Sequence, residues 1–498
     1  MKKCNYNELM ELTKDYQNVF DSLYKLKTFD NAEIDKIYDD IKKNLIETKI
    51  LNPEQIASKI SNIAQYNNRY FKSYWTIFKK LFEEYRIKKA PDITSVFDYF
   101  VFKEYGIVLD QKNQYFFQFY DPIAISIDVH EKNSIFMAIM NDDMKSFIGF
   151  TEKEGFDEKI LFNTHFYPNE LQSLLEFCCY YGAVNCFKFL ITKFDSKITF
   201  SCLRFSFLSG NADIMNECLK QIEPDRECMK YAIISHNIDF VTFLMNEYHI
   251  KIYLYECYSY NNLQAFFVYL DQTNDIDLCL VYSPFFNIPS LCEYLISHEA
   301  DINASNEFGQ TALCSAAWID SKEIVEILIN HGANIESRNE FERTALHVAA
   351  NRNCYDAADV LISSGADINA KDKKYNTPLN LATISGYKET STLLIFYGAN
   401  VNAKDNDKKT PLHWAAYNNL ADIAELLISH GASINAKDRD GLTPLHLASH
   451  YKCKETAKIL LSHGANVHAL DGKKRKPIYF AYNNNDKEMI HLLSSHEA

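Results

Sequence analysis

The 498-residue chain contains little glycine, with only 14 residues of this type, and it shows no glycine-rich phosphate loop. It also lacks the motifs of zinc proteases (H-E-x-x-H), serine hydrolases (G-x-S-x-G) and protein kinases. Most of the glycines lie at turns of a repeat in the second half of the chain, so little glycine is left for a nucleotide-binding fold. The sequence therefore predicts a protein that is not an enzyme and needs no cofactor or metal.

Basic charge is also scarce, because 66 acidic residues outnumber 52 basic ones and give a net charge of −14. Nucleic-acid binders usually show the opposite balance, so we expect no nucleic-acid partner. No run approaches 18 apolar residues and the N-terminus has no apolar signal segment, so we expect neither membrane insertion nor secretion. The 13 cysteines form no C-x-x-C pair, which is typical of reduced thiols inside the cell. We expect the cytoplasm, with the nucleus as the alternative.

The second half of the chain contains a repeat with a period of 33 residues. A Thr-Ala-Leu or Thr-Pro-Leu triplet begins at Thr311, Thr344, Thr377, Thr410 and Thr443. A Gly-Ala pair keeps the same step and begins at Gly332, Gly365, Gly398, Gly431 and Gly464. A fixed period of this length indicates stacked units that bury their apolar faces only against their neighbours.

The residue types within one unit predict two short helices and a turn. Thr410 can cap the first helix, and Pro411 then takes the first helical position, where no backbone N–H is needed. Ile423 and Leu427 belong to an apolar stripe at helical spacing, which predicts a second helix. Gly431 is expected to end this helix with a positive φ. The polar segment that follows is rich in turn-forming residues and is expected to project as a finger.

These features resemble the ankyrin repeat, whose 33-residue period and T-P-L-H signature recur over residues 306–496. The resemblance implies an all-α fold, a solenoid of stacked helix-turn-helix units with β-turn fingers. Residues 276–498 then hold one worn unit, five clear units and a C-terminal cap unit. His347, His413 and His446 belong to the signature, so we expect them to bond turn backbone rather than to act in catalysis or bind a metal.

Several positions depart from the signature and are expected to cost local stability. Cys314 and Asn380 replace the histidine, while Asp320 and Lys452 replace the glycine or asparagine of the turn between the two helices. Because a β-branched residue fits poorly at positive φ, the sequence also predicts a larger loss of stability from Gly431→Val than from His413→Ala.

The first half of the chain shows the same alternation of helices and turns less clearly. Residues 126–275 lack the signature but read as degenerate ankyrin-like helical hairpins that continue the array, with a separate helical domain as the alternative. Residues 1–125 are predicted to be mostly helical, and residues 103–122 could hold short strands. This layout resembles ankyrin proteins of parasitic protists that carry a domain of unknown function ahead of regular repeats, which implies no activity.

The ankyrin resemblance places finger tips and first-helix ends on one concave face, where side chains are free to vary. The candidate protein-binding residues at these positions are Phe308, Trp318, Arg338, Phe341, Arg343, Arg352, Lys373, Lys374, Tyr417, Arg439 and Tyr451. Exposed Trp, Tyr and Arg dominate binding energy at interfaces, and basic side chains would attract an acidic protein segment. A lysine-rich face that is only solvated is the alternative.

The resemblance thus implies a monomeric, non-enzymatic scaffold or adaptor that binds a partner protein. The alternative is a regulatory or targeting subunit of an enzyme complex, such as a ubiquitin ligase or a phosphatase. In that case residues 1–125 would dock the catalytic partner.

Overall fold

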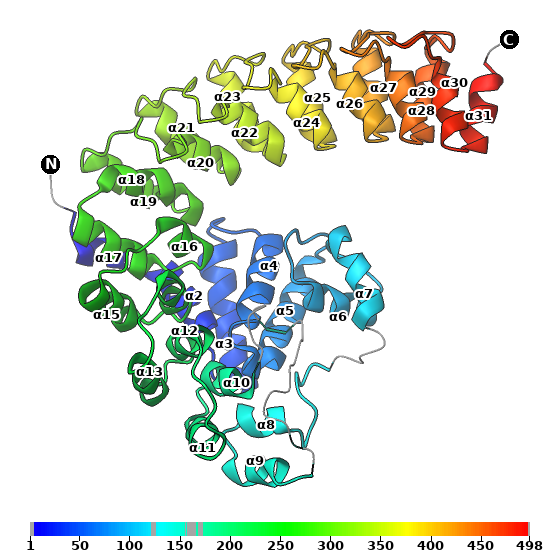
Figure 1. Ribbon diagram of the computed structural model, residues 1–498. Coiled ribbons are helices and arrows are strands. Elements are labelled where there is room, and N and C mark those ends of the chain that lie inside the picture. Colours follow the sequence, from blue (N-terminus) through cyan, green and yellow to red (C-terminus); the bar gives the residue numbers. More distant parts are fainter. Residues whose placement is uncertain (1–3, 121–125, 155, 157–165, 168–172, 497–498) are drawn as a thin grey trace. The chain divides into compact units, whose positions relative to one another are not determined.

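The computed structural model describes residues 4–120, 126–154, 156, 166–167 and 173–496. Within these residues the regular secondary structure is helical, and the β-structure is one isolated bridge between Ser305 and Thr311. The described chain divides into two compact units, residues 4–274 and 275–498 (Figure 1). The expected all-α fold class is confirmed.

The unit of residues 275–498 is a stack of helix pairs, which we call the array. The pairs are α18 (Ile276–Tyr282) and α19 (Pro289–Ser297), α20 (Ala312–Trp318) and α21 (Lys322–Asn330), α22 (Ala345–Arg352) and α23 (Tyr355–Ser363), α24 (Pro378–Ile384) and α25 (Lys388–Phe396), α26 (Pro411–Tyr417) and α27 (Ala421–Ser429), α28 (Pro444–His450) and α29 (Lys454–Ser462), and α30 (Pro477–Asn483) and α31 (Lys487–Ser494). A 3-10 helix, η5 (Ser283–Phe286), lies between α18 and α19. First helices contact first helices and second helices contact second helices, as in a solenoid.

The threonine and histidine of the signature explain how each first helix starts. In α26, Nδ1 of His413 accepts hydrogen bonds from the backbone N–H and the hydroxyl of Thr410, at 3.1 and 2.8 Å. Nε2 then donates to the carbonyl of Leu442 in the next unit, at 3.1 Å. Burial lowers the pKa of His413 to about 4, so the ring stays neutral. His347 and His446 make the same contacts, which confirms their predicted structural role.

A residue in the left-handed conformation separates the two helices of each unit. Positive φ values occur at Asn353, Gly386, Asn419 and Asn485. Asp320 and Lys452 adopt the same conformation, with φ of 59° and 60°, although their side chains favour it less than glycine or asparagine. Gly431, after the second helix, has φ of 87°, as expected.

Each finger of the array is built around a polar side chain that accepts backbone N–H groups, and most of these side chains are buried. Asp405 accepts the backbone N–H groups of Asp407 and Lys409, both at 2.9 Å, which closes the finger on itself. The N–H of Asn406 donates to the carbonyl of Lys374 in the preceding finger, at 3.0 Å. Asp372, Asp438 and Asp471 play the part of Asp405 in their own fingers. The fingers are therefore ordered both internally and against each other.

The unit of residues 4–274 contains helical hairpins that lack these fingers. The hairpins are α8 (Ile135–Met140) and α9 (Met144–Thr151), α10 (Leu174–Tyr181) and α11 (Val184–Phe194), α12 (Phe200–Ser209) and α13 (Ala212–Leu219), α14 (Arg226–Ile234) and α15 (Ile238–Tyr248), and α16 (Leu254–Ser259) and α17 (Leu263–Thr273). Their left-handed turns at Gly210, His236 and Asn261 follow each other after 26 and 25 residues, instead of 33. The period is shorter because residues 220–225 suffice to join α13 to α14, whereas residues 331–344 join α21 to α22.

The N-terminal segment is also helical. Its elements are α1 (Tyr6–Leu12), α2 (Lys14–Tyr24), α3 (Asn31–Ile41), the π-helix η1 (Lys42–Ile46), α4 (Pro53–Ala64), the 3-10 helix η2 (Asn68–Tyr70), α5 (Phe71–Tyr85), α6 (Ser95–Tyr105), the 3-10 helix η3 (Gln111–Asn113) and α7 (Gln114–Tyr120). The expectation of strands in residues 103–122 is wrong for residues 103–120, and residues 121–122 lie outside the described chain. Buried Asp98 accepts the N–H groups of Leu109 and Asp110, at 2.7 and 3.0 Å, and so folds this segment back on α6.

The N-terminal helices pack against the first-helix ends of the hairpins. The hydroxyl of Tyr180 donates to the carbonyl of Gln65 at 2.6 Å, and Nδ1 of His236 lies 2.7 Å from Oδ1 of Asp21. The ring of Tyr24 stacks on His236, with 4.1 Å between the centroids. The boundary that we predict near residue 125 therefore lies inside one compact unit.

Candidate functional site

The candidate residues lie on two parts of the array, the fingers and the ends of the first helices. The finger residues are Phe308, Arg338, Phe341, Arg343, Lys373, Lys374 and Arg439. The residues at the first-helix ends are Trp318, Arg352, Tyr417 and Tyr451. We call the surface made by these eleven residues the finger face.

Trp318 and Arg352 form a contact between two neighbouring units. The guanidinium of Arg352 lies over the Trp318 indole, 4.3 Å from the ring centroid, and 39% of Trp318 is exposed. Trp318 ends α20 and Arg352 ends α22, so the contact bridges two first helices. A cation held on an aromatic ring presents positive charge and apolar area at the same place. This pair can bind a partner that offers a carboxylate beside an apolar group.

Tyr417 and Tyr451 form a similar pair three units later along the stack of helices. The two members of each pair are 34 residues apart in the sequence. The centroids of the two tyrosine rings lie 4.2 Å apart. The side-chain amide of Asn418, beside Tyr417, donates to the carbonyl of Ile384 in the preceding unit at 3.1 Å. The first-helix ends of the finger face thus carry two such pairs, Trp318 with Arg352 and Tyr417 with Tyr451.

Two candidate arginines are engaged by the fold itself. Nε of Arg343 donates to the carboxylate of Asp372, which is buried, at 3.2 Å. Arg338 donates to the backbone carbonyl of Lys371 in the next finger at 2.7 Å. Because these bonds would have to break or be shared, both side chains are better placed to hold fingers together than to bind a partner strongly.

The other charged finger residues are Arg439, Lys373 and Lys374. Arg439 pairs with the exposed carboxylate of Asp407 at 3.3 Å, which is a weak contact in water, and it also donates to the backbone carbonyl of Asn406 in the preceding finger. The side chains of Lys373 and Lys374 are exposed beside them. These residues keep the fingers positively charged where a partner would approach.

The aromatic finger tips complete the face. Phe308 is 48% exposed and Phe341 is 54% exposed, which is unusual for phenylalanine. Sequence reasoning missed Tyr375, which is 54% exposed and lies under the ammonium of Lys371, 5.2 Å from its ring centroid. The available signal was an aromatic residue in a finger that is otherwise polar and charged.

Two absences within the described residues bear on other kinds of function. No group of three or more His, Cys, Asp or Glu side chains in this part of the chain is arranged to hold a metal ion. No described helix is long and apolar enough to cross a membrane.

Comparisons with known families match the geometry of the repeats. A model described as ankyrin repeats (3 copies) matches residues 280–372 and 369–438, and a model of a single ankyrin repeat matches residues 440–472. A domain of unknown function, DUF3447, matches residues 194–269, which include α12 to α16 and most of α17. The comparison with curated proteins gives no significant match.

Proposed function

Because the chain is an ankyrin-repeat protein with a domain of unknown function ahead of its repeats, we propose that it is a non-enzymatic scaffold or adaptor whose finger face binds a partner protein. Ankyrin repeats support a role in protein–protein interaction. The observation that carries our proposal is the half-exposed Trp318 with Arg352 held on its ring. An exposed indole with a fixed cation combines the two residue types that contribute most at interfaces.

The charge of the fingers supports an acidic partner segment. Lys373, Lys374 and Arg439 are exposed on a chain whose net charge is −14, so the finger face is a local positive region on an acidic protein. Such a contrast steers a complementary segment to one face and disfavours approach elsewhere. We therefore propose that the partner presents acidic side chains beside an apolar one.

The N-terminal unit gives an internal precedent for protein binding at first-helix ends. There, Oδ1 of Asn261 accepts hydrogen bonds from the hydroxyl of Tyr16 at 3.1 Å and from Nζ of Lys59 at 2.5 Å. Asn261 is the left-handed turn residue after α16, the position that Asn353 and Asn419 hold in the array. Helices α2 and α4 thus cover a surface whose equivalent in the array carries the finger-face aromatics.

This packing makes the regulatory-subunit alternative less favourable. That alternative needs residues 1–125 to be available to a catalytic partner, whereas α2 and α4 already contact the hairpins through Tyr16, Lys59 and other side chains. We therefore favour an adaptor that acts as a monomer. We place it inside the cell, because no disulfide joins its cysteines in the described chain and most of them are buried.

The proposal is tested by affinity purification from the native cell with the full chain and three variants. Trp318→Ala removes the proposed anchor and Arg352→Glu reverses its charge. Phe396→Ala is the matched control, since Phe396 is an 81% exposed aromatic at the end of α25, outside the finger face. We expect both finger-face variants to lose a partner that the wild type and the control retain, with melting temperatures within about 2 °C of wild type.

Retention of every partner by Trp318→Ala and Arg352→Glu would contradict the proposal. So would loss of partners only with Phe396→Ala. Recovery of a ligase, kinase or phosphatase through residues 1–125 would instead favour the regulatory alternative.

A further inference from the structure

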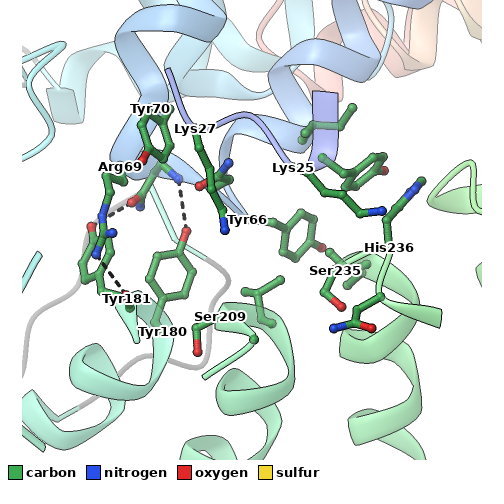
Figure 2. Close-up of a pocket in the computed structure, with 18 of the residues that line it drawn as sticks. Lys25, Lys27, Tyr66, Arg69, Tyr70, Tyr180, Tyr181, Ser209, Ser235 and His236 are labelled. Atoms are coloured by element: carbon green, nitrogen blue, oxygen red, sulfur yellow. Dashed lines mark hydrogen bonds between the residues drawn. The ribbon is translucent and has the colours of Figure 1, made fainter. Parts of the chain in front are cut away.

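A cavity of about 610 Å³ lies within the N-terminal unit (Figure 2). One wall is formed by the end of α2 with the segment after it, and by residues from the end of α4 through η2. The facing wall is formed by the end of α10 and by the turns that follow α12 and α14. Small-molecule sites usually have volumes of about 300–1,000 Å³. The cavity is therefore large enough for a ligand of metabolite size.

The lining of the cavity is rich in positive charge. Its cationic side chains include Lys25, Lys27 and Arg69, while Asp239 is the single acid among the described lining residues. Lys25 pairs with Asp21 at 3.1 Å. No carboxylate of the described chain lies within ion-pair distance of Lys27 or Arg69. The cavity thus has uncompensated positive charge, which favours an anionic ligand.

Arg69 is fixed in place before any ligand binds. Its guanidinium donates to the backbone carbonyls of Tyr181, at 2.9 Å, and Met140, and lies 5.5 Å from the centroid of the Tyr181 ring. Its buried Nε has no hydrogen-bond acceptor among the described residues. A cation oriented by backbone carbonyls loses little side-chain entropy when an anion binds. These carbonyl contacts leave the charge of Arg69 available to a ligand.

Aromatic rings form much of the remaining wall. Tyr66, Tyr70 and Tyr180 line the cavity and come from both of its walls (Figure 2). Such rings bind flat groups by stacking or edge contacts. Ser235 also lines the cavity, and because its hydroxyl donates to the carbonyl of Ala232 at 2.9 Å, it can accept a hydrogen bond from a ligand.

We propose that this cavity binds a compact anion that carries a planar ring, of the chemical class of an aryl phosphate monoester. The anionic oxygens lie beside Lys27 and Arg69, and the ring packs among the tyrosines. A free metabolite and a phosphotyrosine side chain share this chemistry. The site is independent of the finger face, so its failure and the failure of the proposed function are separate results.

Isothermal titration calorimetry of the full chain with phenyl phosphate, phenol and inorganic phosphate tests the proposal. We expect phenyl phosphate to bind at least about tenfold more tightly than either fragment, since it alone has both the ring and the charge. Its affinity should fall as the salt concentration rises. Equal affinity for phenol and phenyl phosphate, or no binding of phenyl phosphate, would overturn the proposal.

Variants of two lysines show whether the effect belongs to the cavity. Lys27→Glu should weaken phenyl phosphate at least about tenfold, because it reverses a lining charge. Lys36→Glu is the matched control, since Lys36 is exposed on α3 and does not line the cavity. Ser235→Leu should also weaken binding, because it fills cavity volume without changing charge. Unchanged affinity in Lys27→Glu and Ser235→Leu, with wild-type circular dichroism, would locate the ligand elsewhere and overturn the proposal.

A phosphotyrosine hexapeptide distinguishes the two sources of the ligand. Affinity at or below that of phenyl phosphate supports a free small molecule. Affinity at least about tenfold above it supports a modified protein segment that continues out of the cavity.

Discussion

Asp320 stands in the left-handed turn between α20 and α21, with φ of 59°, where most other units have asparagine or glycine. Its carboxylate accepts a hydrogen bond from the N–H of Ala357 in the next unit, at 2.9 Å. Burial, with a contribution from the charge of Asp356, raises the pKa of Asp320 to about 6 despite this bond. Asparagine would keep the acceptor oxygen, remove the charge and suit the left-handed backbone. We therefore expect Asp320→Asn to stabilise the array at pH 7.

The magnitude follows from the pKa difference between the folded and the unfolded chain. A folded pKa of about 6 against about 3.9 in the unfolded chain corresponds to at most about 3 kcal/mol at pH 7. The carboxylate is partly exposed and solvent screens it, so we expect a gain of about 1 kcal/mol from the substitution. The folded pKa is raised, so the unfavourable effect of the charge is absent below about pH 4, develops between about pH 4 and pH 6, and is fully present above pH 6. The gain should follow the same course.

Unfolding by urea, followed by circular dichroism at several pH values between 4 and 7.5, measures this effect on the full chain. Because the buried histidines are the same in both proteins, their contribution to the pH dependence cancels when the free energies of unfolding of variant and wild type are subtracted. Lys452→Asn is the matched control, because Lys452 has the same turn geometry, with φ of 60°, and no carboxylate. It should gain about 0.5 kcal/mol from the backbone alone, with no dependence on pH.

A gain for Asp320→Asn that does not change with pH would show that the charge is well solvated in the folded chain. A loss at pH 7 would show that the carboxylate stabilises the N-terminus of α23 through the helix dipole by more than its burial costs. Either result would refute the assignment of the raised pKa to an unfavourable buried charge.

Four further predictions concern the array. Asn380→His should raise the free energy of unfolding by about 1 kcal/mol in urea titrations. The reason is that the buried Nδ2 of Asn380 has no acceptor in the described chain, whereas histidine would donate to the next finger. An unchanged unfolding midpoint would argue against this. His413→Ala should cost about 2–4 kcal/mol, since it removes three hydrogen bonds from a fully buried ring. Gly431→Val should cost about 1–2 kcal/mol, because a Cβ there would meet no atom within 4 Å and only the backbone is strained; this reverses the order predicted from the sequence. A fragment of residues 276–498 should fold alone with a cooperative melt, and a disordered fragment would contradict the agreement of caps, turns and packing in each unit.

The array was predictable because its signature residues act locally. Thr410 and His413 are three residues apart, and the turn at Asn419 follows soon after, so the motif can be seen in one short window. The contact of His413 with the next unit recurs after a constant sequence separation. The sequence underestimates the contribution of this histidine to stability, because the bond between units becomes visible only when the units are stacked.

The N-terminal packing was not predictable in the same way. Tyr180 and Gln65 are 115 residues apart, and no repeated spacing relates them. The cavity depends on such contacts, so its lysines and tyrosines had no common signal in the sequence. The engagement of Arg338 was hidden for a related reason, since its acceptor is a backbone carbonyl whose position depends on the next finger.

The presence or absence of fingers offers a physical reason why the two units treat their helix ends differently. In the array, Asp405 and its counterparts order the fingers, while Trp318 and Tyr451 at the first-helix ends stay exposed. In the N-terminal unit the hairpins have no such fingers, and Tyr180 and Tyr181 at the end of α10 are buried by other parts of the same chain. Buried tyrosine hydroxyls need acceptors, and these come partly from Gln65 and Asn68 in the N-terminal segment. The N-terminal helices therefore cover the first-helix ends of hairpins that lack fingers, and they supply acceptors for the buried hydroxyls there. The array has fingers and can leave the same positions open to a partner.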